Sequence, residues 1–97
     1  MTDNVVSITV ALPEESAVLR FTGRDAWTLA CLIDRGEIGV TPIERPAPRW
    51  SEYIRRLRKA GLVIETLHEL HGGPYKGHHG RYVLRTPLSV IERQAAA

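Results

Sequence analysis

The sequence predicts one small α+β domain in which helices lie between two β-hairpins. Three features indicate this fold class: an alternating β-branched segment near the N-terminus, a basic amphipathic helix in the middle, and a glycine-rich loop between two strand-like segments. The 97 residues suffice for a single domain, 1–97, with a modest core. We expect an ordered core at about residues 6–86, with residues 1–4 and 94–97 frayed.

The composition is that of an ordinary globular domain. Hydrophobic residues make up 43% of the chain and charged residues 25%. No segment approaches the ~20 apolar residues of a membrane span, and the first residues lack the pattern of a secretory signal. We therefore expect a cytoplasmic protein that does not contact a membrane. Cys31 is the only cysteine, which excludes an intrachain disulfide and favours a small buried hydrophobic side chain.

The N-terminal third predicts a β-hairpin followed by a helix. Ser7–Leu12 alternates and is rich in β-branched residues, and Val18–Phe21 is its expected partner strand. A helix is expected from Gly23 to Arg35, with Thr22 as N-cap, Asp25 as its box-like partner and Gly36 as C-terminal cap. Glu37–Val40 should be short and extended.

A second helix start follows at Thr41. Its hydroxyl can cap, Pro42 fits the first helical position, and Glu44 can reach back to the cap amide. Pro46 and Pro48 follow at once, and proline interrupts a helix. The predicted helix, the first member of a helix-turn-helix, is therefore about one turn long.

The segment from about Pro48 to Ala60 predicts a strongly two-sided helix. Trp50, Tyr53, Ile54 and Leu57 fall at i, i+3, i+4 and i+7 and share one face. The rest of its surface is polar or charged: Arg49, Ser51, Glu52, Arg55, Arg56, Arg58 and Lys59. With these apolar residues we expect a core that consists of Trp27, Leu29, Ile33, Ile43, Trp50, Tyr53, Ile54, Leu57, Leu62, Ile64, Tyr82 and Leu84.

The C-terminal third predicts a second hairpin. Leu62–Leu70 and Arg81–Arg85 have strand patterns, the glycine-rich segment His71–Gly80 connects them, and Leu88–Arg93 is expected as a last helical turn. The order is then hairpin, helix, short strand, short helix, turn, helix, hairpin. This is a winged helix-turn-helix arrangement: a three-helix core with a C-terminal β-hairpin wing and an N-terminal β-hairpin.

Four stretches, together spanning about residues 18–86, carry a family resemblance: Gly23–Trp27, Gly39–Ile43, Pro48–Arg58 and Ile64–Leu84. On these stretches the chain resembles small bacterial winged helix-turn-helix proteins of a phage-like type. The resemblance implies the winged-helix fold, which serves in regulators, replication and packaging factors, and protein-docking adaptors. The chain departs from the usual pattern in its very short first helix-turn-helix member, which leaves the docking angle of the next helix open.

Charge is distributed unevenly along the chain. Residues 1–44 carry three Arg and seven Asp or Glu, whereas residues 45–97 carry ten Lys or Arg and four Glu. A basic half suggests a face for an anionic partner, although charge alone favours an ordinary solvated surface.

Double-stranded DNA is the expected partner of the helix at 48–60. Arginine can bond bidentately to guanine, and residues near the N-terminus of such a helix reach base edges. The candidate base readers are Arg49, Ser51, Glu52 and Arg55. Arg56 and Lys59 lie toward the flank and suit phosphates, whereas Arg58 borders the apolar face and suits a structural role.

The wing at residues 70–81 is the second candidate DNA contact. Its glycines permit a close approach to a phosphate, and its cations would lie on the backbone or in the minor groove. The candidates are Lys76, His78, His79 and Arg81. The alternative is a solvated loop without a partner.

Other chemistries have weaker support. His68, His71, His78 and His79 lack the spacing of a common zinc finger and no cysteine joins them, so we expect no metal site. No nucleophile and base can be paired, so we expect neither an enzyme nor a cofactor.

The leading hypothesis is thus a DNA-binding winged-helix protein, a small transcription regulator. The alternative is a protein-interaction module, an adaptor or phage-derived accessory factor, that docks an acidic partner through the basic helix. In that alternative, the strand at residues 7–12 could also pair across the edge of a homodimer.

Overall fold

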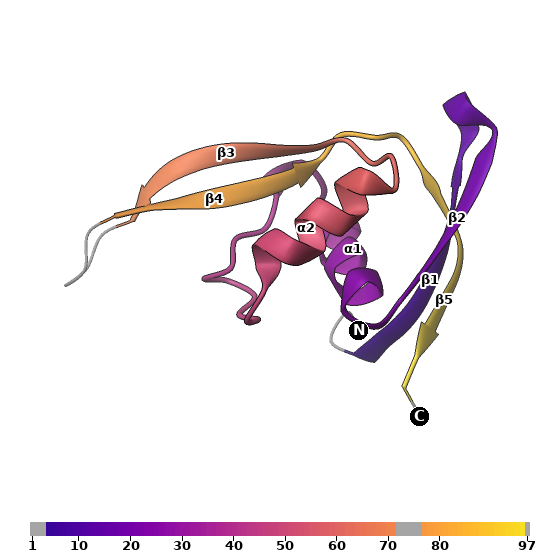
Figure 1. The fold of residues 1–97 in the computed structure, drawn as a ribbon, viewed down its shortest axis with the longest axis horizontal. Coiled ribbons are helices and arrows are strands. Elements are labelled where there is room, and N and C mark those ends of the chain that lie inside the picture. Colours follow the sequence, from indigo (N-terminus) through magenta and orange to yellow (C-terminus); the bar gives the residue numbers. More distant parts are fainter. Residues whose placement is uncertain (1–3, 72–76, 97) are drawn as a thin grey trace.

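The computed structural model describes residues 4–71 and 77–96, without the side chains of residues 70, 71 and 77–79. Figure 1 shows two helices packed in the centre, a three-stranded sheet on one side of them, and a long hairpin that projects beyond them. The elements are β1 (Val5–Leu12), η2 (Pro13–Glu15), β2 (Ala17–Thr22), α1 (Gly23–Arg35), η3 (Gly36–Ile38), α2 (Trp50–Lys59), β3 (Ile64–His71), β4 (Gly77–Leu84) and β5 (Ser89–Ala95). The two η elements are single 3-10 turns.

The N-terminal hairpin forms as predicted, and a third strand joins it. The sheet order is β2-β1-β5, with β1 antiparallel to both neighbours. The expected helical turn at Leu88–Arg93 is wrong, because this segment pairs with β1 and extends the sheet to Ala95. The expected dimer contact through residues 7–12 is also wrong, since both edges of β1 are occupied within the chain.

Helix α1 has the predicted bounds. The amide of Gly36 caps it by donating to the carbonyl of Leu32, at a positive φ of 55° that favours glycine. The expected capping by Thr22 does not form, since its side chain makes no cap hydrogen bond. Asp25 instead accepts a hydrogen bond from Arg56 of α2.

The predicted three-helix core is wrong, because the described residues contain two α-helices. The Thr41–Glu44 box does form: the Glu44 amide donates to Thr41 Oγ1 at 3.1 Å, and the Thr41 amide donates to Glu44 Oε1 at 3.2 Å. It closes one turn and no more, because Pro46 and Pro48 cannot supply the next amide donors. The expected extended segment before it is η3 followed by a single bridge between Val40 and Tyr82.

The core lies between the three-stranded sheet, α1 and α2. Most predicted members are buried, whereas Ile33, Tyr82 and Leu84 are half-buried and pack against the core. The prediction that Ile43 belongs to the core is wrong. Its side chain is 59% exposed, because the one-turn segment that carries it does not continue into a helix that could pack on the core. Much of β1 and α1 belongs to the core without having been predicted, notably Ile8, Val10, Leu12, Ala30 and Leu32.

The wing is a longer ribbon than predicted. Strands β3 and β4 pair from Ile64 opposite Leu84 to His71 opposite Gly77, so the described residues of the expected His71–Gly80 loop, His71 and Gly77–Gly80, are strand. The ribbon projects past the helices, as Figure 1 shows. Strand β4 thereby reaches both the α2 side of the molecule and the segment around Val40.

Candidate nucleic-acid interface

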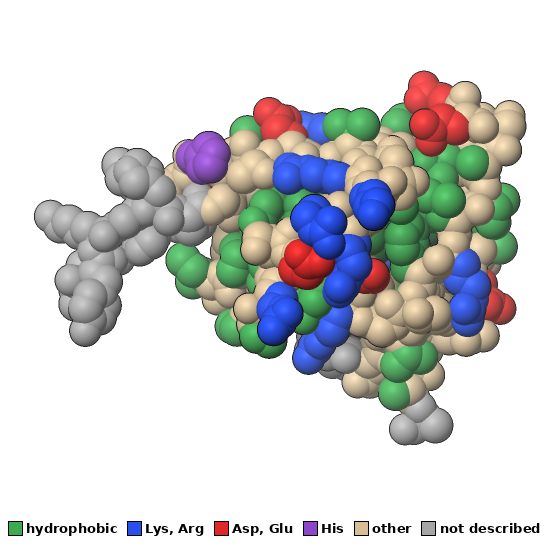
Figure 2. Space-filling model, in the orientation of Figure 1, with side chains coloured by type: hydrophobic (Ala, Val, Ile, Leu, Met, Phe, Trp, Pro, Cys, Tyr) green, Lys and Arg blue, Asp and Glu red, His purple; other side chains and the backbone are tan. Residues whose placement is uncertain are grey.

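Helix α2 divides into a buried face and a charged face, as predicted. Trp50, Tyr53, Ile54 and Leu57 are all buried. Lys and Arg side chains gather over α2 on the side of the molecule seen in Figure 2, interrupted by acidic groups. The exposed members that the sequence predicted for this surface are Arg49, Ser51, Arg55, Arg56 and Lys59, with Glu52 half-buried among them.

Trp50 sets the position where α2 begins. Its indole nitrogen donates to the carbonyl oxygen of Arg45 at 2.5 Å. Its ring stacks on Tyr82 of β4 and lies tilted against Trp27 of α1. One side chain therefore joins α2 to α1, to the preceding loop and to the wing.

Arg58 has the structural role expected from its position beside the apolar face. Its guanidinium donates to the carbonyl oxygen of Ile64 from both Nε and a terminal nitrogen, and to Thr66 Oγ1 at 2.8 Å. These bonds hold the C-terminal end of α2 against β3. The wing and the exposed face of α2 therefore have a defined mutual orientation.

The exposed cations of α2 differ in how far other groups engage them. Arg55 forms a two-point ion pair with Glu52. Arg56 donates to Asp25 Oδ1 at 2.9 Å and lies over the Tyr53 ring. Arg49 and Lys59 make no side-chain hydrogen bond or ion pair within residues 4–71 and 77–96, although the Arg49 charge helps to lower the pKa of Glu52.

A shallow, open depression of about 390 Å³ lies between α2 and the start of α1. Arg55, Arg56 and Lys59 line it together with Asp25 and Ala60. Asp25 and the neighbouring Glu52 offset two of the three cations. The one net positive charge that is left suits a singly charged oxyanion such as a backbone phosphate. This places the two predicted phosphate contacts, Arg56 and Lys59, beside the predicted base reader Arg55.

Arg81 is engaged inside the protein. Its Nε donates to Glu69 Oε2 at 2.8 Å, and a terminal nitrogen donates to Glu44 Oε1 at 3.2 Å and to the carbonyl oxygen of Ile38. The hydrogen bond to Glu69, with the nearby Glu44 charge, raises the pKa of Arg81 in spite of partial burial. The side chain connects the wing to the turn before α2, which is a different role from the predicted DNA contact.

Glu44 is the centre of this connection. It accepts from Arg81, from Arg35 of α1 at 3.2 Å, and from Thr41. Partial burial raises the pKa of the Glu44 carboxyl, but the charges of Arg81 and Arg35 and the Thr41 hydrogen bonds outweigh it and lower the pKa below its usual value. The carboxylate thus ties α1, the one-turn segment and β4 together.

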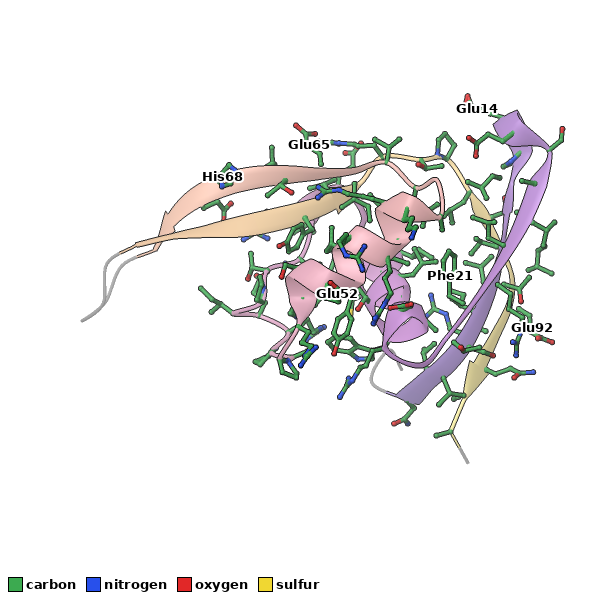
Figure 3. All side chains as sticks on the ribbon, in the orientation of Figure 1. Glu14, Phe21, Glu52, Glu65, His68 and Glu92 are labelled. Carbon is green, nitrogen blue, oxygen red and sulfur yellow. The ribbon has the colours of Figure 1, made fainter. Side chains whose placement is uncertain are left out.

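The remaining predicted wing contacts are only partly placed. The backbone of His78 lies opposite Leu70 and that of His79 opposite Glu69, whereas Lys76 lies outside the described residues. His68 is exposed on β3 (Figure 3). Among the described residues, no three His, Cys, Asp or Glu side chains are grouped so that they could hold a metal ion.

Sequence reasoning missed two cations near the candidate surface. The Arg45 carbonyl oxygen accepts a hydrogen bond from the Trp50 indole, so Arg45 flanks the start of α2. Arg24 lies over the Trp27 ring at 4.9 Å and is next in sequence to Asp25, the partner of Arg56. Arg45 could have been found from its place in the proline-rich approach to α2, whereas the link from Arg24 through Asp25 to α2 depends on a long-range contact.

The paired helices, the turn that precedes α2 and the projecting ribbon define a protein of the winged helix-turn-helix class. The chain belongs to the winged helix domain family, whose model matches residues 18–94. No curated protein and no solved structure matches the chain. No helix in the described part of the chain is long and apolar enough to cross a membrane.

Proposed function

We propose that the protein binds double-stranded DNA as a small transcription regulator, with the exposed face of α2 in the major groove. The observation that carries this proposal is the division of α2, whose apolar face is buried while its other face presents Arg49, Arg55, Arg56 and Lys59 to solvent. A helix held on one side by a core and basic on the other matches how such helices read DNA. The projecting wing would lie on the backbone or in the minor groove.

The residues differ in their proposed roles. Arg49 and Ser51 at the start of α2 and Arg55 in its middle would face base edges, with Glu52 beside them. Arg56 and Lys59 would contact phosphates from the depression next to α1, and exposed Arg45 would do so at the other end of the helix. Lys76, His78 and His79 stay proposed wing contacts. Arg81 is reassigned to the internal network, because its Nε and one terminal nitrogen are already bonded to Glu69 and Glu44.

Binding to a pool of random-sequence duplexes at several salt concentrations tests the proposal. Affinity should fall as salt rises, because each phosphate contact releases counterions and adds about 0.9 to the slope of the log–log plot. Repeated selection should enrich particular sequences. Folded protein that fails to shift any duplex at low salt would refute the proposal.

Three single substitutions separate the roles. Arg49→Ala should relax the sequence preference, whereas Lys59→Ala should weaken binding to all duplexes and lower the salt slope by about one. Arg20→Ala is the matched control, because Arg20 is an exposed cation on β2 with no side-chain partner in the described residues. An equal effect of Arg20→Ala and Lys59→Ala would mean that binding reflects net charge and not the α2 surface.

The protein-interaction alternative remains as the other outcome of this test. A homodimer that pairs through residues 7–12 is excluded, because β2 and β5 already occupy both edges of β1. A folded protein that binds an acidic polypeptide through α2, but no DNA, would favour it over the regulator.

A further inference from the structure

Glu52 and Arg55 form a two-point ion pair on the exposed face of α2. Arg55 Nε donates to Glu52 Oε2 at 3.0 Å, and an Arg55 terminal nitrogen donates to Glu52 Oε1 at 2.5 Å. Both side chains keep contact with solvent, at 61% exposure for Arg55 and 36% for Glu52. The hydrogen bond from Arg55 is the main reason that the pKa of Glu52 lies below its usual value, so the carboxylate stays ionised.

The pair leaves one edge of the guanidinium free. Arginine has five N–H donors in a rigid planar fork. Glu52 engages the side edge, formed by Nε and one terminal nitrogen, whereas the end edge between the two terminal nitrogens has no partner in residues 4–71 and 77–96. Two parallel donors of this kind match the O6 and N7 acceptors of guanine in the major groove.

We propose that Glu52 is a positioning residue that holds Arg55 with its end edge outward, and that the pair makes α2 select a G·C base pair. The inference rests on the proposed function, since it requires α2 in the major groove. A tethered arginine loses less side-chain freedom when it binds than a mobile one. The composition of α2 agrees, because the helix contains no Asn or Gln, the side chains that pair with adenine.

The cations around Glu52 make it possible to distinguish a positioning role of Glu52 from a purely electrostatic one. Glu52 is an acidic group among phosphate-binding candidates, so by itself it should weaken binding to any DNA. If it also positions Arg55, its removal has two effects of opposite sign. Total affinity should rise because a repulsive charge is lost, while discrimination for guanine should fall because the Arg55 fork becomes mobile.

The experiment uses the full chain and duplexes selected from a random pool. Replacing the selected guanine by another base should lower wild-type affinity by about 5- to 150-fold. Replacing it by 7-deazaguanine, which lacks the N7 acceptor, should lower affinity as well. Glu52→Ala should bind the pool more tightly at low salt and lose most of this discrimination. Arg55→Lys, which keeps the charge without the fork, should lose it too.

Glu65→Ala is the matched control for Glu52→Ala. Glu65 pairs with Arg85 at 2.7 Å and is similarly exposed, but it lies on the outer side of β3, away from α2 (Figure 3). It should leave the guanine preference unchanged. Each variant's circular dichroism spectrum should match that of the wild type.

Three results would overturn the inference, and they differ from one another. If Glu52→Ala keeps the full guanine preference, Glu52 does not position Arg55 and affects binding only through its charge. Wild-type protein that binds DNA without a guanine preference at any position would remove the G·C selection but leave the DNA-binding function. Wild-type protein that binds no duplex would remove the proposed function itself, and this inference with it.

Discussion

The indole ring of Trp50 stacks on the phenol ring of Tyr82, with ring centroids 6.0 Å apart and planes inclined by 11°. The same indole lies 5.5 Å from the Trp27 ring and donates to the Arg45 carbonyl. The first residue of α2 thus contacts α1, the proline-rich loop and the wing. We infer that this side chain sets the orientation of the α2 surface.

Trp50→Ala should therefore lower the free energy of unfolding by ~3–5 kcal/mol, the usual cost of deleting a buried aromatic ring. Trp50→Phe keeps a ring but leaves the Arg45 carbonyl without its donor, which should cost about 1–3 kcal/mol. Urea denaturation followed by circular dichroism measures both. Ile43→Ala is the control, since an exposed side chain should change stability by less than about 0.5 kcal/mol. A Trp50→Phe protein as stable as the control would contradict the anchoring role.

Gly39 should tolerate no side chain. It has a positive φ of 76°, and a Cβ atom there would lie 2.8 Å from the Tyr82 carbonyl oxygen and 2.8 Å from Val83 Cγ2. Gly36 has a positive φ of 55° but open space around it. A substitution there therefore measures the cost of the backbone conformation without any steric clash. Gly36→Ala should cost about 1–3 kcal/mol, because its φ and ψ lie in a region that side chains disfavour, and Gly39→Ala should cost clearly more because β4 must also move. Equal thermal midpoints for the two variants would show that β4 does not pack closely against Gly39.

The lowered pKa of Glu44 should appear as a pH dependence of stability. A carboxyl with a lower pKa in the folded state stabilises the fold fully above its usual value of 4.5, and that contribution is lost as pH falls through the folded pKa. Glu44→Gln should therefore be less stable than wild type at neutral pH, and the difference should shrink in acid. Denaturation at a series of pH values measures this. Parallel curves for the two proteins would contradict a lowered pKa.

Arg81→Ala is the companion to that experiment. It removes the largest of the charges that lower the Glu44 pKa, so the acid-dependent part of the stability should shrink in this variant as well. Arg85→Ala removes an arginine of the same ribbon that pairs with Glu65 instead. The stability of the Arg85→Ala control should therefore depend on pH as strongly as the stability of the wild type does.

Local signals in the sequence were sufficient for some elements. Gly36 ended α1 where its cap geometry required, and the i, i+3, i+4 spacing identified the buried face of α2. The Thr41–Glu44 box also formed, but the prolines after it limited it to one turn. In each case the deciding atoms lie within a few residues of one another, which is the range that a sequence pattern can report.

Long-range contacts decided what the sequence could not. Strand β5 depends on the free edge of β1, more than half the chain away, and its own pattern fits a helical turn equally well. The same holds for the site. Arg81 and Arg56 look alike as surface cations in the sequence. The structure shows that Arg81 is half-buried between Glu69 and Glu44, whereas Arg56 pairs with Asp25 but stays exposed at the border of an open depression.

Two buried threonines should respond oppositely to the same substitution. Thr28 in α1 is fully buried, and its hydroxyl has no hydrogen-bond partner within the described residues. Thr28→Val replaces this hydroxyl by a methyl group of similar size, so it should raise the free energy of unfolding by about 1 kcal/mol. Valine and threonine have similar helix propensities, which leaves the desolvated hydroxyl as the main difference.

Thr41→Val is the matched comparison. Thr41 is equally buried, but its hydroxyl accepts from the Glu44 amide at 3.1 Å and donates to Glu44 Oε1 at 3.3 Å. Valine would remove both of these hydrogen bonds, although the Glu44 amide keeps a second acceptor in the Thr41 carbonyl oxygen at 3.1 Å. Stability should therefore fall by about 0.5–1.5 kcal/mol. Thermal and urea denaturation of the two variants should give shifts of opposite sign. If Thr28→Val is destabilising by as much as Thr41→Val, the Thr28 hydroxyl must have a partner in solution, such as a buried water, that offsets its burial.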